Sequence, residues 1–153
     1  MPIKFRISPD LDLVYTAWWG DVSIAEWRQV FSRYLNDPHY RPGRTELTDL
    51  SGVGRIDATF NSIWSALNMV NGQLPGGAER TRTVLVTPGE VAFGLARMYQ
   101  TLAENADGIK VEIYRTPEAA LRALNLGYGS VEELLEHGGF LPSAPADAQS
   151  DGA

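Results

Sequence analysis

The sequence contains no cysteine, which excludes disulfides, thiolate metal sites, cysteine nucleophiles and iron–sulfur clusters. Its only histidines, His39 and His137, lie far apart and indicate neither a metal site nor a catalytic triad. No apolar run approaches the roughly 20 residues of a membrane-spanning helix, and the N-terminus lacks the apolar stretch of a signal peptide. We therefore expect a cytoplasmic protein with no membrane-spanning segment, no metal and no cofactor.

Basic residues are absent from the last 26 residues, which carry a charge of −5, whereas the rest of the chain carries −1. Proteins that bind duplex nucleic acid need a basic stripe to neutralise phosphates, so this distribution argues against a nucleic-acid partner. The chain has 153 residues, of which 44% are hydrophobic, enough for one domain with a packed core.

Apolar residues spaced at helical intervals predict four helices, each preceded by a capping signal. The helices are expected at 24–35, 58–70, 91–102 and 120–124. Ser23 and Glu26 form a capping box at the first of them. Asp57 is expected to cap the second at Ala58, and Thr87-Pro88 to begin the third.

Alternating and continuous apolar runs predict five strands. They are expected at 3–7, 11–19, 44–50, 83–86 and 109–113. The first two form a hairpin, and the later alternation of strands with helices indicates parallel pairing. We expect an α/β fold with a five-stranded, mixed but mostly parallel sheet and helices mainly on one face. Alternation along the second strand places Trp18 on the more polar face and Trp19 on the apolar one.

Two segments resemble the SpoIIAA-like family of bacteria, also labelled STAS or STAS/SEC14-like domains. Residues 49–59, DLSGVGRIDAT, are similar to the strand, loop and helix start that form the STAS signature. Residues 93–100, FGLARMYQ, and 111–121, VEIYRTPEAAL, resemble SpoIIAA-like proteins more specifically. The resemblance covers about residues 3–126 and implies a SpoIIAA-like β-α superhelix. It also implies either a regulator that binds partner proteins or a carrier of apolar ligands.

By position in this resemblance, Thr59 matches the residue that is phosphorylated in regulatory members, and Asp57 matches the aspartate before it. Two residues depart from that pattern, since Ala58 replaces a serine and Phe60 replaces a glycine. The alternative interpretation is structural: Asp57 caps the helix, Thr59 supports the cap and Phe60 belongs to the core.

The carboxyl ends of parallel strands gather ligand sites, so a polar loop site is expected to include Asp49, Ser51, Asp57 and Thr59. The alternative for Asp49 is that it accepts hydrogen bonds from amides of its own turn. If an apolar cavity lies between the sheet and the second and third helices, it is expected to be lined by Ile63, Trp64, Met69, Phe93 and Met98. The alternative there is a filled core.

Trp18, on its polar sheet face, is a candidate dimer surface unless the segment around Leu134, Leu135 and Phe140 covers it. Residues 1–126 are expected to form the domain, 127–141 an appendage with a short amphipathic helix, and 142–153 a disordered tail. The leading hypothesis is a non-enzymatic regulatory domain that binds a protein partner or a second copy of itself. The alternative is a domain that binds a small apolar molecule or lipid. An enzyme using Asp49 and Asp57 is a third, disfavoured by the lack of a recognisable nucleophile–base pair.

Overall fold

The computed structural model describes residues 2–71, 81–104 and 109–142. The elements are β1 (Ile3–Ser8), β2 (Leu13–Ser23), α1 (Ile24–Leu35), β3 (Thr45–Asp57), α2 (Phe60–Asn71), β4 (Thr81–Val86), α3 (Glu90–Glu104), β5 (Ile109–Tyr114), α4 (Pro117–Leu124) and α5 (Val131–His137). This order confirms the predicted alternation of strands and helices. None of the helices in these ranges is long and apolar enough to cross a bilayer. The tail predicted to be disordered lies, from residue 143, outside the described residues.

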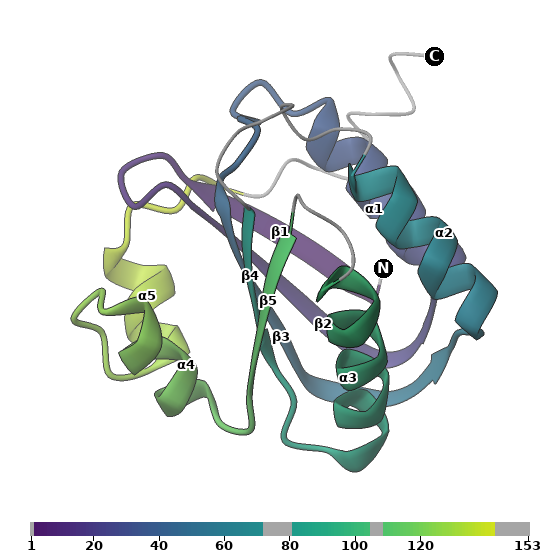
Figure 1. Ribbon diagram of the computed structural model, residues 1–153. Coiled ribbons are helices and arrows are strands. Elements are labelled where there is room, and N and C mark those ends of the chain that lie inside the picture. The colour runs from purple at the N-terminus through teal and green to yellow at the C-terminus, as the bar shows by residue number, and fades with distance from the viewer. Residues whose placement is uncertain (1, 72–80, 105–108, 143–153) are drawn as a thin grey trace.

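The strands form one sheet in the order β1-β2-β3-β4-β5 (Figure 1). β1 and β2 pair antiparallel, as predicted for a hairpin, and all later pairs are parallel. Because each parallel neighbour needs a crossover, a helix follows each of β2, β3 and β4 before the next strand begins. The predicted five-stranded, mixed and mostly parallel sheet is therefore confirmed.

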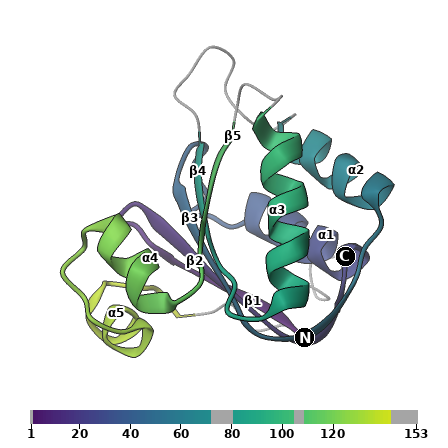
Figure 2. The ribbon, with the colours of Figure 1, turned by 60° about the horizontal axis from the view of Figure 1, so that its bottom comes forward.

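Helices cover both faces of the sheet unequally, as Figure 2 shows. The longer helices α1, α2 and α3 lie on one face, and the short helices α4 and α5 lie on the other. Under α4 and α5, Leu13, Leu47 and Val84 of the sheet pack with Leu121 and Leu134 of these helices. The prediction that helices cover mainly one face is confirmed.

β2 and β3 run further than predicted and form a long parallel ribbon that ends at Ser23 and Asp57. Gly52 and Gly54, which the STAS resemblance predicted to lie in a loop, are part of this ribbon. Gly20 adopts a positive φ of 70° beside a register shift between the strands. At Gly52 an added Cβ would lie 3.0 Å from the Cβ of Trp19, so the absence of a side chain there favours the close approach of the strands.

The prediction for which side chains of β2 lie under the long helices was wrong. Leu13 and Tyr15 pack on the α4 and α5 side, whereas Val14, Thr16 and Trp18 face α1–α3. Both faces of this inner strand are covered by helices, so alternation alone could not distinguish them. Trp19, expected in the core, is exposed.

Capping residues set most helix starts. Ser23, Thr116 and Ser130 are N-caps whose hydroxyl oxygens accept from backbone amides three residues on, which confirms the cap predicted at Ser23. Thr87 is not a cap: it is fully buried, and α3 begins three residues later. Asp57 does not cap α2 either, since it is the last residue of β3 and Thr59 takes that role.

Residues 127–142 pack onto the domain rather than over Trp18. Leu134 of α5 is completely buried beneath the sheet face that α4 also covers. The Ser8 hydroxyl donates to the Gly138 carbonyl, and the Arg6 guanidinium donates to the carbonyls of Phe140 and Leu141. The alternative in which this segment covers Trp18 is therefore wrong, because the segment lies on the opposite face.

Candidate functional site

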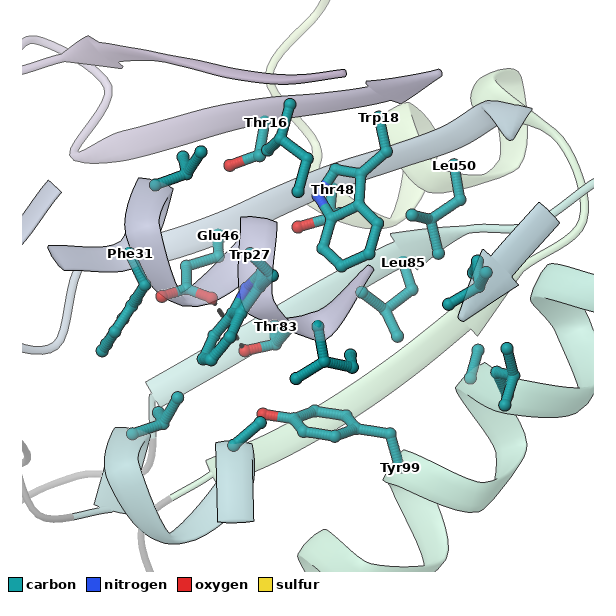
Figure 3. A pocket seen from close by; sticks show the side chains of 18 of the residues that line it. Thr16, Trp18, Trp27, Phe31, Glu46, Thr48, Leu50, Thr83, Leu85 and Tyr99 are labelled. Carbon is teal, nitrogen blue, oxygen red and sulfur yellow. Dashed lines mark hydrogen bonds between the residues drawn. The ribbon is translucent and has the colours of Figure 1, made fainter. Parts of the chain in front are cut away.

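A cavity of about 150 Å³ lies between the sheet and the helices α1, α2 and α3 (Figure 3). Side chains of β1 to β4 form its floor, and side chains of the three helices form its walls and roof. Most of the lining is apolar, with a small number of polar groups on the floor. Such a lining is typical of sites for small organic ligands.

Small side chains in the roof explain why the space is not filled. Ala66 of α2 and Ala92 and Ala96 of α3 are buried and border the cavity. An alanine methyl group reaches only a short way toward the sheet, so these helices leave a gap where leucine or phenylalanine would close it. On the α1 side, Trp27 and Phe31 stack with ring centroids 5.0 Å apart.

The floor carries a row of polar side chains from three adjacent strands. Thr16 of β2 is paired in register with Thr48 of β3, and Glu46 of β3 with Thr83 of β4. Register partners in a parallel sheet project to the same face, and all four side chains line the cavity. Figure 3 shows the Glu46 carboxylate directed toward the Thr83 hydroxyl.

Glu46 is the only carboxylate among the described residues that line this cavity. The Thr83 hydroxyl donates to its Oε2 across a long 3.4 Å, the one hydrogen bond that the described residues provide. Burial raises the pKa of Glu46 to about 7, and the Thr83 hydrogen bond offsets only part of this effect. The carboxyl group therefore titrates near neutral pH, which is a common property of functional groups.

Two further polar side chains border the cavity. Burial raises the pKa of Tyr99 on α3, and the nearby Glu46 charge raises it further, so its hydroxyl stays protonated. The indole N–H of Trp18 is buried and has no acceptor among the described residues. A buried donor without an acceptor is unfavourable.

Of the five residues predicted to line the cavity, one does so. Ile63 lines the cavity, but Trp64, Met69, Phe93 and Met98 are not among its lining residues. Trp64 is 44% exposed. The rotation of α2 about its axis directs Ile63 toward the cavity and leaves Trp64 on the exposed side. On α3, the ring of Phe93 instead lies beneath the Arg115 guanidinium, 4.1 Å from the ring centroid.

The predicted polar loop residues are not gathered at one place. Asp49 and Asp57 lie in the same strand, eight positions and thus roughly 26 Å apart along it. Asp49 accepts from the Tyr15 hydroxyl and from the backbone amide of Ser51. The alternative for Asp49 is correct in the hydrogen bond from a local amide but wrong in the turn, because Asp49 and Ser51 both lie within β3. Ser51 and Asp57 are exposed on the ribbon.

Thr59 is exposed at the start of α2, where it and Ser62 cap each other. The Ser62 amide donates to the Thr59 hydroxyl at 3.1 Å, and the Thr59 amide donates to the Ser62 hydroxyl at 2.8 Å. Next to it, Phe60 and Trp64 are 56% and 44% exposed. The alternative interpretation in which Phe60 belongs to the core is therefore wrong.

Trp18 lines the cavity instead of an open sheet face, so the reason for expecting a dimer surface there is removed. Sequence reasoning missed Glu46, Tyr99 and Trp27 as site residues. One signal was available: Glu46 and Thr48 alternate with Leu47 in a strand that the fold places at the centre of the sheet. A charged residue at such a position is unusual and is often functional.

Comparison with solved structures finds a protein of similar fold. An uncharacterised protein of the DUF3478 family with a SpoIIAA-like fold, from Shewanella loihica PV-4, superposes with a TM-score of 0.51. Its sequence is 17% identical, and the match covers 80% of this chain and 91% of that protein. No protein-family model and no curated protein matches the sequence. At this identity the similarity establishes the fold, so the predicted SpoIIAA-like architecture is confirmed.

Proposed function

We propose that this chain is a non-enzymatic binding domain that holds a small, mainly apolar molecule in the cavity between the sheet and α1–α3. The observation that carries the proposal is the cavity itself, about 150 Å³ in volume and lined by side chains of both layers. A cavity of similar size in another protein binds benzene, so the space suits a ligand with one ring or a short branched chain. Burial of apolar ligand surface supplies the main driving force.

Binding is favoured over catalysis by the kinds of polar groups present. The described lining residues include one carboxyl group, threonine hydroxyls and tyrosine hydroxyls, but no histidine, lysine or serine. Covalent catalysis needs a nucleophile next to a base that activates it, and this set offers no such pair. The polar groups are suited to orienting a ligand.

Toluene is a suitable probe, and its binding is measured by NMR chemical-shift changes of Ile63 and Leu95 methyl groups, which line the cavity. We expect saturable shifts in the wild-type protein. Ala96→Leu adds bulk in the cavity and is expected to abolish binding. Ala25→Leu adds the same bulk on the exposed side of α1 and is expected to leave binding unchanged. Absence of saturable shifts in the wild-type protein contradicts the proposal.

A regulatory protein contact at the start of α2 is a second candidate, supported by a separate observation. The exposed aromatic side chains Phe60 and Trp64 lie one helical turn apart, next to the exposed Thr59 hydroxyl. Isolated exposed apolar residues are ordinary, but an adjacent pair beside a modifiable hydroxyl suits a switchable contact.

Mass spectrometry of the protein purified from its own host tests this second candidate. A phosphoryl group that survives denaturation and maps to Thr59 supports it. Mass that is lost on denaturation supports the bound ligand of the first proposal. Unmodified Thr59 under all growth conditions tested contradicts control by phosphorylation.

A further inference from the structure

We infer that the cavity selects ligands in which a protonated amine is attached to the apolar body, with the amine bound by the Glu46 carboxylate. This inference rests on the proposed binding function and adds the chemical class of the ligand. It depends on three features of the lining: the charge it carries, the aromatic rings around it and the state of Glu46 before a ligand arrives.

The described lining residues carry one ionisable acid and no basic side chain. Arg41 and Arg44 share with Glu46 only the smaller neighbouring pocket, and Arg41 pairs with Asp12. Arg44 is buried and already engaged: it pairs with Asp12 and donates to the carbonyls of Ser8 and His39. The ionised carboxylate of Glu46 therefore has no cationic partner within this lining, and a cationic ligand would provide one.

Aromatic rings surround the same space. Trp18, Trp27, Phe31 and Tyr99 all line the cavity with Glu46, as Figure 3 shows. The faces of aromatic rings attract cations, and the attraction is larger where water is excluded. Aromatic rings combined with a carboxylate are the chemistry by which proteins recognise organic ammonium groups.

The folded protein has already removed much of the water around Glu46. In most buried ion pairs, the desolvation of both partners cancels the attraction between them. Here folding has desolvated the carboxylate before binding, so an arriving amine loses only its own hydration. A charge-assisted hydrogen bond from the amine would then replace the long bond from Thr83 as the principal partner of Glu46.

Several titratable groups face Glu46 and set the conditions of a test. Tyr34 of α1, Tyr40 of the following loop and Tyr99 of α3 all interact with its charge, and burial raises the pKa of each, so they stay neutral. Arg44 and Asp12 form an ion pair, and the charges of both act on Tyr34. Above a pH of about 7, Glu46 is therefore the group in the cavity whose charge a cation can neutralise.

Benzylamine, benzyl alcohol and toluene share one aromatic body and differ in the attached group. Isothermal titration calorimetry at about pH 8, where Glu46 is mostly ionised, compares the amine with the alcohol. Toluene binding is followed by the methyl shifts described above. We expect the wild-type protein to bind benzylamine at least about tenfold more tightly than benzyl alcohol. Glu46→Gln keeps the shape of the side chain and is expected to reduce this ratio to about one. Glu118→Gln makes the same change on the exposed surface of α4 and is expected to preserve it.

The results distinguish a failure of the amine selectivity from a failure of the proposed binding function. If toluene and benzyl alcohol bind and benzylamine binds no more tightly, the inference is wrong and the binding function stands. If the preference for the amine survives in Glu46→Gln, the inference is also wrong, because another group provides the selectivity. If none of the three compounds binds the wild-type protein, the binding function itself fails.

Discussion

At the scale of single residues, the roof of the cavity depends on side chains that are small. Ala66, Ala92 and Ala96 keep α2 and α3 from filling the space above Glu46. Large residues at these positions would gain packing energy. The cavity is thus retained at a cost to stability, which is expected where an open space serves binding.

One nearby glycine has no such role, and its replacement should stabilise the protein. Gly94 is an exposed residue within α3, and an added Cβ there meets no atom within 4 Å. Gly94→Ala should raise the free energy of unfolding by about 0.5–1 kcal/mol, because alanine restricts the unfolded chain and suits a helix. Urea denaturation measures this change.

Gly127→Ala is the matched control for that substitution. Its added Cβ also meets nothing within 4 Å, but its φ is 83°. Alanine is strained in the left-handed region, so this variant should lose about 1 kcal/mol. Stabilisation at both glycines, or at neither, would show that backbone conformation does not decide the outcome.

At the scale of elements, capping residues and periodicity predicted most of the chain correctly. Ser23, Thr116 and Ser130 each act through atoms within three residues, so their signals are local and could be read directly. The length of β3 could not be read from local signals, because the ribbon past Gly52 depends on a close approach to β2 across the sheet. Long-range pairing overrides the local signal that glycines give for a turn.

The candidate site was harder to predict than the fold because its position depends on helix rotation. The apolar residues of α2 include both Ile63, which faces the cavity, and Trp64, which is exposed. Adjacent helical residues differ by about 100° in direction, so the rotation of the helix about its axis decides which of the two faces the sheet. Glu46 resembled a solvent-facing strand residue, and only the helices packed above it make it the floor of a cavity.

The helix α5 is predicted to be an essential part of the domain. Leu134 is fully buried against Leu13, Leu47 and Val86 of the sheet. Leu134→Ala should lower the free energy of unfolding by about 2–5 kcal/mol, the range typical of buried leucines. Leu135→Ala, at a partly exposed neighbouring position, should cost clearly less. Equal and small losses, measured by urea denaturation, would show that α5 contributes little.

At the scale of the whole molecule, Glu46 links the stability of the fold to pH. Burial raises the pKa of Glu46 to about 7 in the folded protein, from an ordinary value of 4.5. Between these values the folded state binds more protons than the unfolded state, so stability falls as pH rises through this window. Glu112, whose pKa is lowered by Arg82, acts in the opposite sense and only at more acidic pH.

The wild-type protein should therefore lose up to about 3 kcal/mol of unfolding free energy, relative to Glu46→Gln, between about pH 5 and pH 8. Urea denaturation of both proteins at several pH values measures the difference, in which the contributions of groups common to both proteins cancel. Glu118→Gln should follow the wild-type curve, since its carboxyl group is exposed. Parallel curves for the wild type and Glu46→Gln would show that Glu46 is not desolvated. A difference in unfolding free energy that grows with rising pH and disappears when benzylamine is added would place the amine on the carboxylate.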